Sequence, residues 1–323
     1  MSETNKNESD TSSNDDNDKR FHERDMTLKD VLKLTQKALP RESINETCQT
    51  KLNREDYGFV QYAMDMLANP IAEIKIKLNT LNSIQVVEPG DNFSVYEESL
   101  DDIVGYLCDI DIAKDFEKIG GFKEIYPLLK HFNPSIRWRA AAVYAECSQN
   151  HDYCQIKLFE EKEVLAELFN LLKNDPDSTV KFKALSAVSC IFRDNKEGLK
   201  VLMEYDGLYI LINAMECETE RFNSKAAFFL SCICESNPEV KDKLIETGYA
   251  ELLSKLIIKQ NEFEDRIENL LLGIESLIRD NNKAVSAVKK TGLLSHLNKV
   301  RTQTSIESYI LDIIQRLVEI LAT

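Results

Sequence analysis

Residues 178–195 read STVKFKALSAVSCIFRDN, and this stretch decides the fold of the chain. Each residue of an α-helix turns about 100° around the helix axis. At that angle six apolar side chains fall on one side, namely Val180, Ala184, Ala187, Val188, Ile191 and Phe192. The stretch therefore predicts one amphipathic helix whose apolar side packs into a core.

The pattern of this helix recurs three times along the chain. The related stretches are SIRWRAAAVYAECSQN at 135–150, RFNSKAAFFLSCICESN at 221–237 and DRIENLLLGIESLIRDN at 265–281. The four helices are offset by 44, 42 and 44 residues when they are aligned on Ala140, Ala184, Ala226 and Leu270. A constant offset of this size indicates a repeat protein.

A second register agrees with the first. Leu-rich helices follow five markers, spaced by 41, 45, 41 and 44 residues, at Gly121, Lys162, Gly207, Gly248 and Gly292. Two registers of about 40–47 residues indicate armadillo or HEAT repeats, whose units share a continuous core. Glycine before the Leu-rich helix, with a short helix before it, favours armadillo. We predict an all-α fold, a right-handed superhelical armadillo-repeat solenoid of about four repeats with helical caps.

The remaining segments divide around these repeats. Residues 1–25 hold only two large apolar side chains, so we expect an acidic, disordered tail. From there the predicted divisions are a short amphipathic helix with its linker at 26–50, N-terminal capping helices and a loop at 51–96, armadillo repeats at 97–301, and a C-terminal capping helix at 302–323.

Composition excludes several classes of function. The chain has 323 residues with 40 Lys and Arg against 55 Asp and Glu, a net charge of −15, which argues against nonspecific nucleic-acid binding. No run approaches about 18 apolar residues, and the N-terminus lacks an apolar segment. We therefore expect no membrane span, no secretory signal, a cytoplasmic location and eight reduced cysteines.

One polar stripe repeats on the side of the helices opposite the core. Phe182, Ser186, Ser189 and Arg193 lie together on that side of the helix in 178–195. The offsets place its counterparts in the other repeats at Trp138, Ala142, Ala145 and Gln149, then Ser224, Phe228, Ser231 and Glu235, then Glu268, Leu272, Glu275 and Arg279.

This helix lines the concave surface in an armadillo stack. The stripe therefore predicts a groove floored by small residues, from which Trp138, Phe182 and Phe228 project. Small side chains let a partner approach, and exposed aromatic rings supply binding energy. The alternative is that these three rings pack against neighbouring repeats.

Residues able to perform catalysis or to hold a metal are scattered. Cys147, His151 and Cys154 match no standard zinc spacing, and a fourth ligand is missing. Cys232 and Cys234 are two apart in a helix and point to different sides. The chain carries no GxGxxG, P-loop or GxSxG motif. We predict no enzyme, no metal site and no cofactor.

Four stretches of the chain carry a resemblance to a known family. The first is Arg137-Trp138-Arg139-Ala140-Ala141 with Cys147-Ser148-Gln149-Asn150. The second is Val180, Lys183-Ala184-Leu185, Ala187, Ser189-Cys190 and Arg193. The others are Lys225-Ala226, Phe228 and Leu230 with Pro238-Glu239, and Leu107-Cys108 with Asp111, Ala113, Asp115 and Phe116. These stretches resemble the heat-shock-protein-70-binding family of armadillo nucleotide exchange factors, which includes Hsp-binding protein one of animals and Fes one of yeast. The resemblance covers roughly residues 95–295.

This resemblance implies a mechanism without catalysis. Such proteins bind the nucleotide-binding domain of a cytosolic heat shock protein 70 chaperone through the concave face, open its cleft and promote release of ADP and of the client. The family's functional alanine and arginine match Ala113 and Arg193. A client-mimic segment of the family would correspond here to DVLKLTQKAL, with Leu28, Val31, Leu32 and Leu34 as its apolar residues. An equally supported alternative is that this segment forms a plain docking helix.

The competing hypothesis is an armadillo scaffold that binds extended peptides of partner proteins. Scaffolds of the nuclear-import type use a repeated ladder of Trp and Asn on the concave surface. A single Trp in the chain weakens this alternative. The expected partner is therefore the chaperone, with no nucleic acid and no membrane, and the chain is expected to be a monomer.

Overall fold

The computed structural model describes residues 69–86, 88, 90–195, 197–260, 267–302 and 306–322. The predicted acidic tail, the amphipathic segment 26–50 and the helix expected before Pro70 lie outside the described residues. The chain divides into two compact units, Met1–Glu73 and Ile74–Thr323. The second unit holds all the repeats, and its described elements are helices joined by turns.

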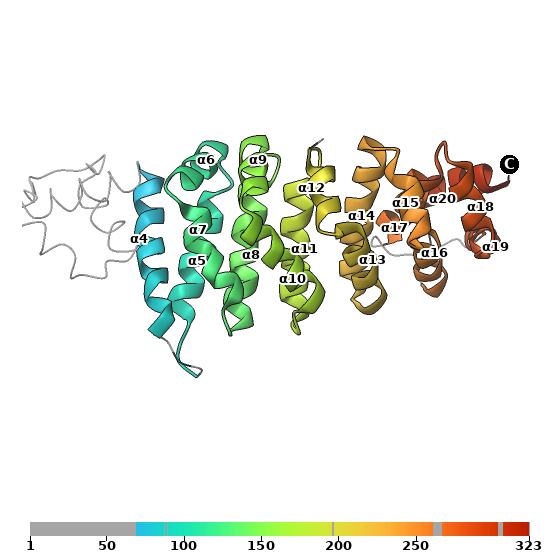
Figure 1. The fold of residues 1–323 in the computed structure, drawn as a ribbon. Helices are drawn as coiled ribbons and strands as arrows, with labels where there is room; N and C mark the ends of the chain where they lie inside the picture. The colour runs from blue at the N-terminus through green and yellow to red at the C-terminus, as the bar shows by residue number, and fades with distance from the viewer. Residues whose placement is uncertain are drawn as a thin grey trace, which may run out of the picture. The chain divides into compact units, whose positions relative to one another are not determined.

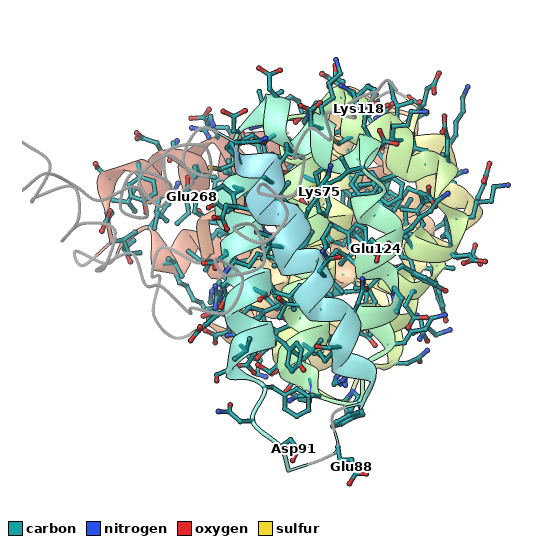
Figure 2. The ribbon with its side chains drawn as sticks, turned by 90° about the vertical axis from the view of Figure 1, so that its left-hand side faces the viewer. Lys75, Glu88, Asp91, Lys118, Glu124 and Glu268 are labelled. Atoms are coloured by element: carbon teal, nitrogen blue, oxygen red, sulfur yellow. The ribbon has the colours of Figure 1, made fainter. Side chains whose placement is uncertain are left out.

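The unit begins within α4 (Pro70–Asn82), which continues into the 3-10 helix η1 (Ser83–Val86) and, after a loop, α5 (Ser94–Tyr106). Glu88 and Asp91 close this loop, because the Glu88 N–H donates to the Asp91 carboxylate at 3.0 Å and the Asp91 N–H donates to Glu88 O at 3.1 Å. Both residues lie at the lower edge of Figure 2. This loop lies within residues 51–96, the segment for which the sequence predicts capping helices and a loop.

Five helical triplets follow in chain order (Figure 1). The first helices of the triplets are α6 (Ile110–Lys118), α9 (Asp152–Glu160), α12 (Gly198–Glu204), α15 (Val240–Glu246) and α18 (Asn282–Lys289). The second helices are α7 (Gly121–Ile125) with η2 (Tyr126–Lys130), α10 (Lys162–Asn174), α13 (Gly207–Cys217), α16 (Tyr249–Lys259) and α19 (Leu293–Val300). The third helices are α8 (Pro134–Ser148), α11 (Ser178–Phe192), α14 (Glu220–Ser236), α17 (Ile267–Ile278) and α20 (Ser308–Ala322).

The third helices stack on one another along the unit. Contacts join α5 to α8, α8 to α11, α11 to α14, α14 to α17 and α17 to α20. The side predicted to face the core is buried, because all six apolar residues of α11 on that side are at most 2% exposed. The armadillo pattern read from residues 178–195 is confirmed. The number of repeats differs, since α20, predicted as a separate cap, is the third helix of a fifth triplet.

Short polar side chains start the third helices. Asp177 accepts hydrogen bonds from the backbone N–H groups of Thr179 and Val180, and Asn133 accepts one from Ser135 N–H. Thr219 caps α14 in the same way. Capping by Asp, Asn or Thr satisfies donors that have no partner inside the helix. These caps set where each third helix begins and so fix its register.

The glycine markers of the sequence serve two different purposes. Gly248 and Gly292 adopt positive φ angles of 82° and 81°, a conformation that favours glycine. In the first triplet Gly120 takes that conformation, while a Cβ on Gly121 would lie 2.4 Å from the ring of Phe116. The marker Gly121 is therefore required for close packing.

The other two markers vary this scheme. Asp206 adopts the positive φ in the third triplet, and Gly207 allows close packing against Leu202. The second triplet lacks glycine, and Glu161 turns the chain with φ −87° instead. The repeats thus tolerate different residues at this turn while the helices keep their order. In the described part of the chain, no helix combines the length and apolarity needed to cross a membrane.

Candidate functional site

Three aromatic rings project from successive third helices. Trp138 on α8 and Phe182 on α11 are half-buried, and Phe228 on α14 is 37% exposed. Trp138 and Phe182 occupy the same position of their repeats, whereas Phe228 lies one turn further along its helix. The sequence analysis offered two alternatives, rings that project into a groove or rings packed against neighbouring repeats. Neither fits fully, because cations lie over the partly exposed rings.

Cations from the following repeat lie over these rings. The Lys183 ammonium is 5.5 Å from the centre of the Trp138 ring, and the Lys225 ammonium is 5.8 Å from that of Phe182. Lys183 and Lys225 hold the same position in successive repeats, 42 residues apart. Each cation–π contact of this kind contributes roughly 0.5–1 kcal/mol at an exposed site.

Three arginines complete the set. The guanidinium carbon of Arg139 lies 4.1 Å from the Trp138 ring centre, that of Arg221 lies 4.2 Å from Phe182, and that of Arg193 lies 5.5 Å from Phe228. We call the combined set the aromatic–cation row, made of Trp138, Phe182, Phe228, Arg139, Lys183, Arg193, Arg221 and Lys225. The row spans α8, α11 and α14.

Arg193 links three repeats within the row. Its Nε donates to the carboxylate of Asp194 at 3.1 Å, and its terminal nitrogen donates to Asn150 Oδ1, beyond the end of α8, at 3.3 Å. Its guanidinium also covers Phe228 on α14. The residue caps the C-terminal end of α11, and Asp194 then takes a positive φ of 60°. The side chain is 20% exposed, so one side of the guanidinium remains accessible.

The small residues of the predicted stripe differ in accessibility. Ala145 is half-buried, and Gln149 and Glu235 are exposed. Ala142 and Ser186 are buried at 8% and 9% exposure, so they form a floor beneath the row. Ser189 is only 1% exposed, although helix angle places it on the exposed side. A part for Ser189 in chaperone binding stays a prediction.

Ala113 also lies in the core. It is 1% exposed on α6, a helix started by Asp109, whose carboxylate accepts from two backbone N–H groups. The side chain packs inside its own protein and helps to keep α6 close to its neighbours. A part for Ala113 in chaperone binding stays a prediction.

The row gathers positive charge. Burial lowers the pKa of Lys225, and the nearby charges of Arg193, Lys183 and Arg221 lower it further. Arg139 is paired with Asp101 at 3.0 Å. The sequence analysis found Arg193 but did not assign the other cations of the row to the site. A basic residue directly after the aromatic position, at Arg139 and Lys183, and in the matching place at Lys225, was the available signal.

The fourth triplet uses the same stripe differently. Glu275 on α17 is 3% exposed and accepts two hydrogen bonds from Arg316 of α20, both at 2.9 Å. Arg279 also pairs with Glu275 at 3.1 Å. These arginines lower the pKa of the Glu275 carboxyl, chiefly through the Arg316 hydrogen bonds. The predicted stripe positions Glu275 and Arg279 therefore join α17 to the last helix.

The residues considered for metal chemistry are held in other contacts. Cys147 and Cys154 are buried, which raises the pKa of both thiols, that of Cys154 to about 12. His151 Nε2 hydrogen-bonds Ile110 O at 2.9 Å. Across the residues that the structure describes, no group of three or more His, Cys, Asp or Glu side chains could hold a metal ion.

Comparison with curated proteins finds Hsp70-binding and Hsp70 exchange-factor proteins among the relatives of the chain. The "Hsp70-binding protein 1" of Rattus norvegicus is 30% identical over 205 residues, covering 62% of this chain and 57% of that protein. The "Hsp70 nucleotide exchange factor FES1" of Coccidioides immitis is 28% identical over 149 residues, covering 46% and 61%. The chain thus spans less than two thirds of the length of these relatives. No family model matches the chain.

Solved structures support the fold. A designed armadillo repeat protein superposes with a TM-score of 0.63 at 22% identity, covering 77% of this chain and 99% of that one. A second, solved "in complex with peptide (KR)4", gives 0.64 at 20% identity with the same coverage. The all-α armadillo fold is confirmed, as is the resemblance of the chain to the Hsp70-binding and FES1 proteins.

Proposed function

We propose that the chain is a nucleotide exchange factor, a co-chaperone that binds the nucleotide-binding domain of a cytosolic heat shock protein 70 chaperone through the aromatic–cation row. The single observation that carries this proposal is Arg193. The resemblance singled out that residue, the helix angles placed it on the stripe, and its side chain lies over the Phe228 ring with 20% of its surface exposed. The curated relatives carry the names of Hsp70-binding and exchange-factor proteins.

The mechanism needs no catalytic group. A binding protein shifts a conformational equilibrium only by its differential affinity for the two states. We propose that the row fits the open, nucleotide-poor domain better than the closed one. ADP then leaves, ATP enters and the client is released. A stack of third helices with a continuous buried core suits this role, because a stiff surface resists following the domain as it closes.

Residues outside the row have supporting roles in this proposal. Ala113 keeps α6 packed, and Ala142, Ala145 and Ser186 form the floor that lets a partner approach the rings. Gln149 and Glu235 lie exposed at the ends of α8 and α14 and extend the surface. The client-mimic role of residues 26–39 lies outside the described residues and stays a prediction, as do the cytoplasmic location and the monomeric state.

The charge of the row separates this proposal from a general peptide scaffold. One structural neighbour was solved with a peptide of Lys and Arg, whose charge is positive. The row of this chain presents cations, so it would repel a peptide of that kind. Among peptide ligands it favours acidic ones.

Binding to the isolated nucleotide-binding domain tests the proposal. We expect titration calorimetry to give one-to-one binding that weakens when ADP is added, since a nucleotide that favours the closed state must compete with the chain. Arg301, an exposed cation outside the row, supplies the matched control: Arg301→Ala should bind as wild type and Arg193→Ala should not. Equal affinity with and without ADP contradicts an exchange role.

A further inference from the structure

The cations of the row are close enough to repel one another. Lys225 on α14 interacts electrostatically with Arg193, Lys183 and Arg221, each of which disfavours its charged form. Lys225 and Arg221 both face Phe182, so the cluster straddles the interface between α11 and α14. Arg221 and Lys225 thus share the Phe182 ring, while Lys183 and Arg193 lie over the neighbouring rings of Trp138 and Phe228.

The cluster lacks the counterions that other cations of the chain have. Lys181, two residues from Lys183, pairs with Glu218 at 2.7 Å, and Arg137 pairs with Asp175 at the same distance. In the part of the chain that the structure describes, no carboxylate forms an ion pair with Lys183, Arg221 or Lys225. Arg193 has only the exposed carboxylate of its neighbour, Asp194.

The missing carboxylate partners of these cations are unexpected because the chain is acidic. With 55 Asp and Glu against 40 Lys and Arg, carboxylates are abundant along the sequence. A half-buried ammonium among other cations is stabilised by an added negative charge, and its contacts with aromatic faces replace only part of that interaction. The site is therefore electrostatically prepared for an anionic ligand.

The spacing of the cations indicates the form of the ligand. Lys183 and Lys225 lie on different helices, and Arg193 sits at the far end of α11 from Phe182. A single phosphate could meet one of these positions, whereas a chain segment carrying several carboxylates could meet them all. Nucleic acid is disfavoured by the net charge of −15.

We propose that the cluster of Lys183, Arg193, Arg221 and Lys225 binds an acidic segment of the partner protein, with carboxylates paired to the cations and apolar atoms against Phe182 and Phe228. This inference rests on the proposed function and deepens it, since it assigns the recognition of the chaperone to carboxylates on the chaperone's surface. It predicts that recognition depends strongly on salt.

A chaperone-free assay tests the cluster directly. The probe is a fluorescein-labelled peptide of about ten glutamates, followed by fluorescence anisotropy with the full chain, and a glutamine peptide of the same length is the neutral control. We expect the glutamate peptide alone to bind, and its affinity to fall several-fold between low and physiological salt.

Two double variants locate the binding. Lys183→Gln with Lys225→Gln removes two unpaired cations of the cluster and should weaken the glutamate peptide about tenfold, as expected when roughly 1.4 kcal/mol is lost. Lys123→Gln with Lys200→Gln removes two exposed lysines outside the row and should leave affinity unchanged. Circular dichroism and thermal unfolding verify that both variants fold.

The outcomes separate this inference from the proposed function. Equal binding by the two double variants, equal binding of the glutamate and glutamine peptides, or tighter binding of a thymidine oligonucleotide overturns the acidic-segment proposal. Competition of the glutamate peptide with the chaperone domain supports it, and binding of both at once overturns it. A chain that binds the peptide in the cluster but no chaperone instead refutes the proposed function.

Discussion

The same position of the stripe has different charged surroundings in two regions of the molecule. Ser189 in the second triplet and Glu275 in the fourth are equivalent by the repeat offsets, and both are buried. In the aromatic–cation row, Lys183, Arg221 and Lys225 form no ion pair with a carboxylate among the described residues. The Glu275 carboxylate, in contrast, is paired with Arg316 of α20 and with Arg279. The difference shows that register alone does not assign a role. Whether the neighbouring repeat supplies a counterion decides if a position serves binding or packing.

The largest expected effect on stability comes from removing Arg316, which pairs with Glu275. Arg316→Ala leaves the buried carboxylate of Glu275 with Arg279 alone. Because the Arg316 side chain is half-exposed, the loss should lie below that of a fully buried pair, at about 2 kcal/mol. We expect urea unfolding to show a loss of that order, with chaperone affinity of the remaining folded protein unchanged. Lys283→Ala, which breaks an exposed pair with Asp242, should leave the free energy of unfolding nearly unchanged. Similar losses in both variants would remove the distinction between the regions.

A change in the aromatic–cation row is expected to weaken binding to the chaperone and to leave stability nearly unchanged. Arg193→Ala removes the guanidinium that covers Phe228 and reaches Asn150. We expect chaperone affinity to fall at least tenfold, about 1.4 kcal/mol, while the free energy of unfolding stays within about 1 kcal/mol of wild type. Calorimetry and urea unfolding measure the two quantities. An unfolded variant would show that Arg193 belongs to packing, like Arg316.

The dependence of stability on pH provides a further test of the Glu275 region. The folded-state pKa of Glu275 lies below its ordinary value of 4.5, because Arg316 donates to the carboxylate. Such a group stabilises the fold above its unfolded pKa, and this contribution is lost as the pH falls through the folded pKa. We expect the stability difference between wild type and Glu275→Gln to be constant near neutral pH and to shrink below about 4.5. A difference that does not change with acid would contradict a charged Glu275.

The smallest expected effect concerns one ring of the row. Phe182→Leu keeps the apolar volume but removes the face that meets Arg221 and Lys225. We expect affinity for the chaperone to fall about two- to fivefold, equivalent to roughly 0.5–1 kcal/mol. Tyr209→Leu changes a ring on α13 that is 58% exposed and outside the row, and it should have no effect.

Local signals in the sequence were enough for the fold. The apolar side of α11 and the repeat offsets predicted the third helices. The helix predicted as the C-terminal cap is α20, which packs on α17 as the third helix of a fifth triplet. The marker Gly121 starts α7, while the positive φ of that turn belongs to Gly120.

The site was predicted less completely, for a physical reason. Helix angle places a residue on a side of its helix, but it does not show what the next repeat lays over it. Ser189 was therefore placed on an exposed side, although it is only 1% exposed. Ala113 came from the family resemblance, and its burial was not foreseen. The pairing of Glu275 with Arg316 joins residues 41 positions apart, so no nearby residue in the sequence indicates it. Arg193 was found from its angle and from the resemblance, and its side chain is 20% exposed beside the Phe228 ring of α14.

Release of fluorescent ADP from the chaperone's nucleotide-binding domain, followed by stopped flow, measures the proposed exchange activity itself. We predict that the full chain accelerates release, that the rate saturates with concentration, and that Arg193→Ala loses most of the acceleration while Arg301→Ala keeps it. Unchanged ADP release across several cytosolic heat shock protein 70 chaperones would contradict the exchange function.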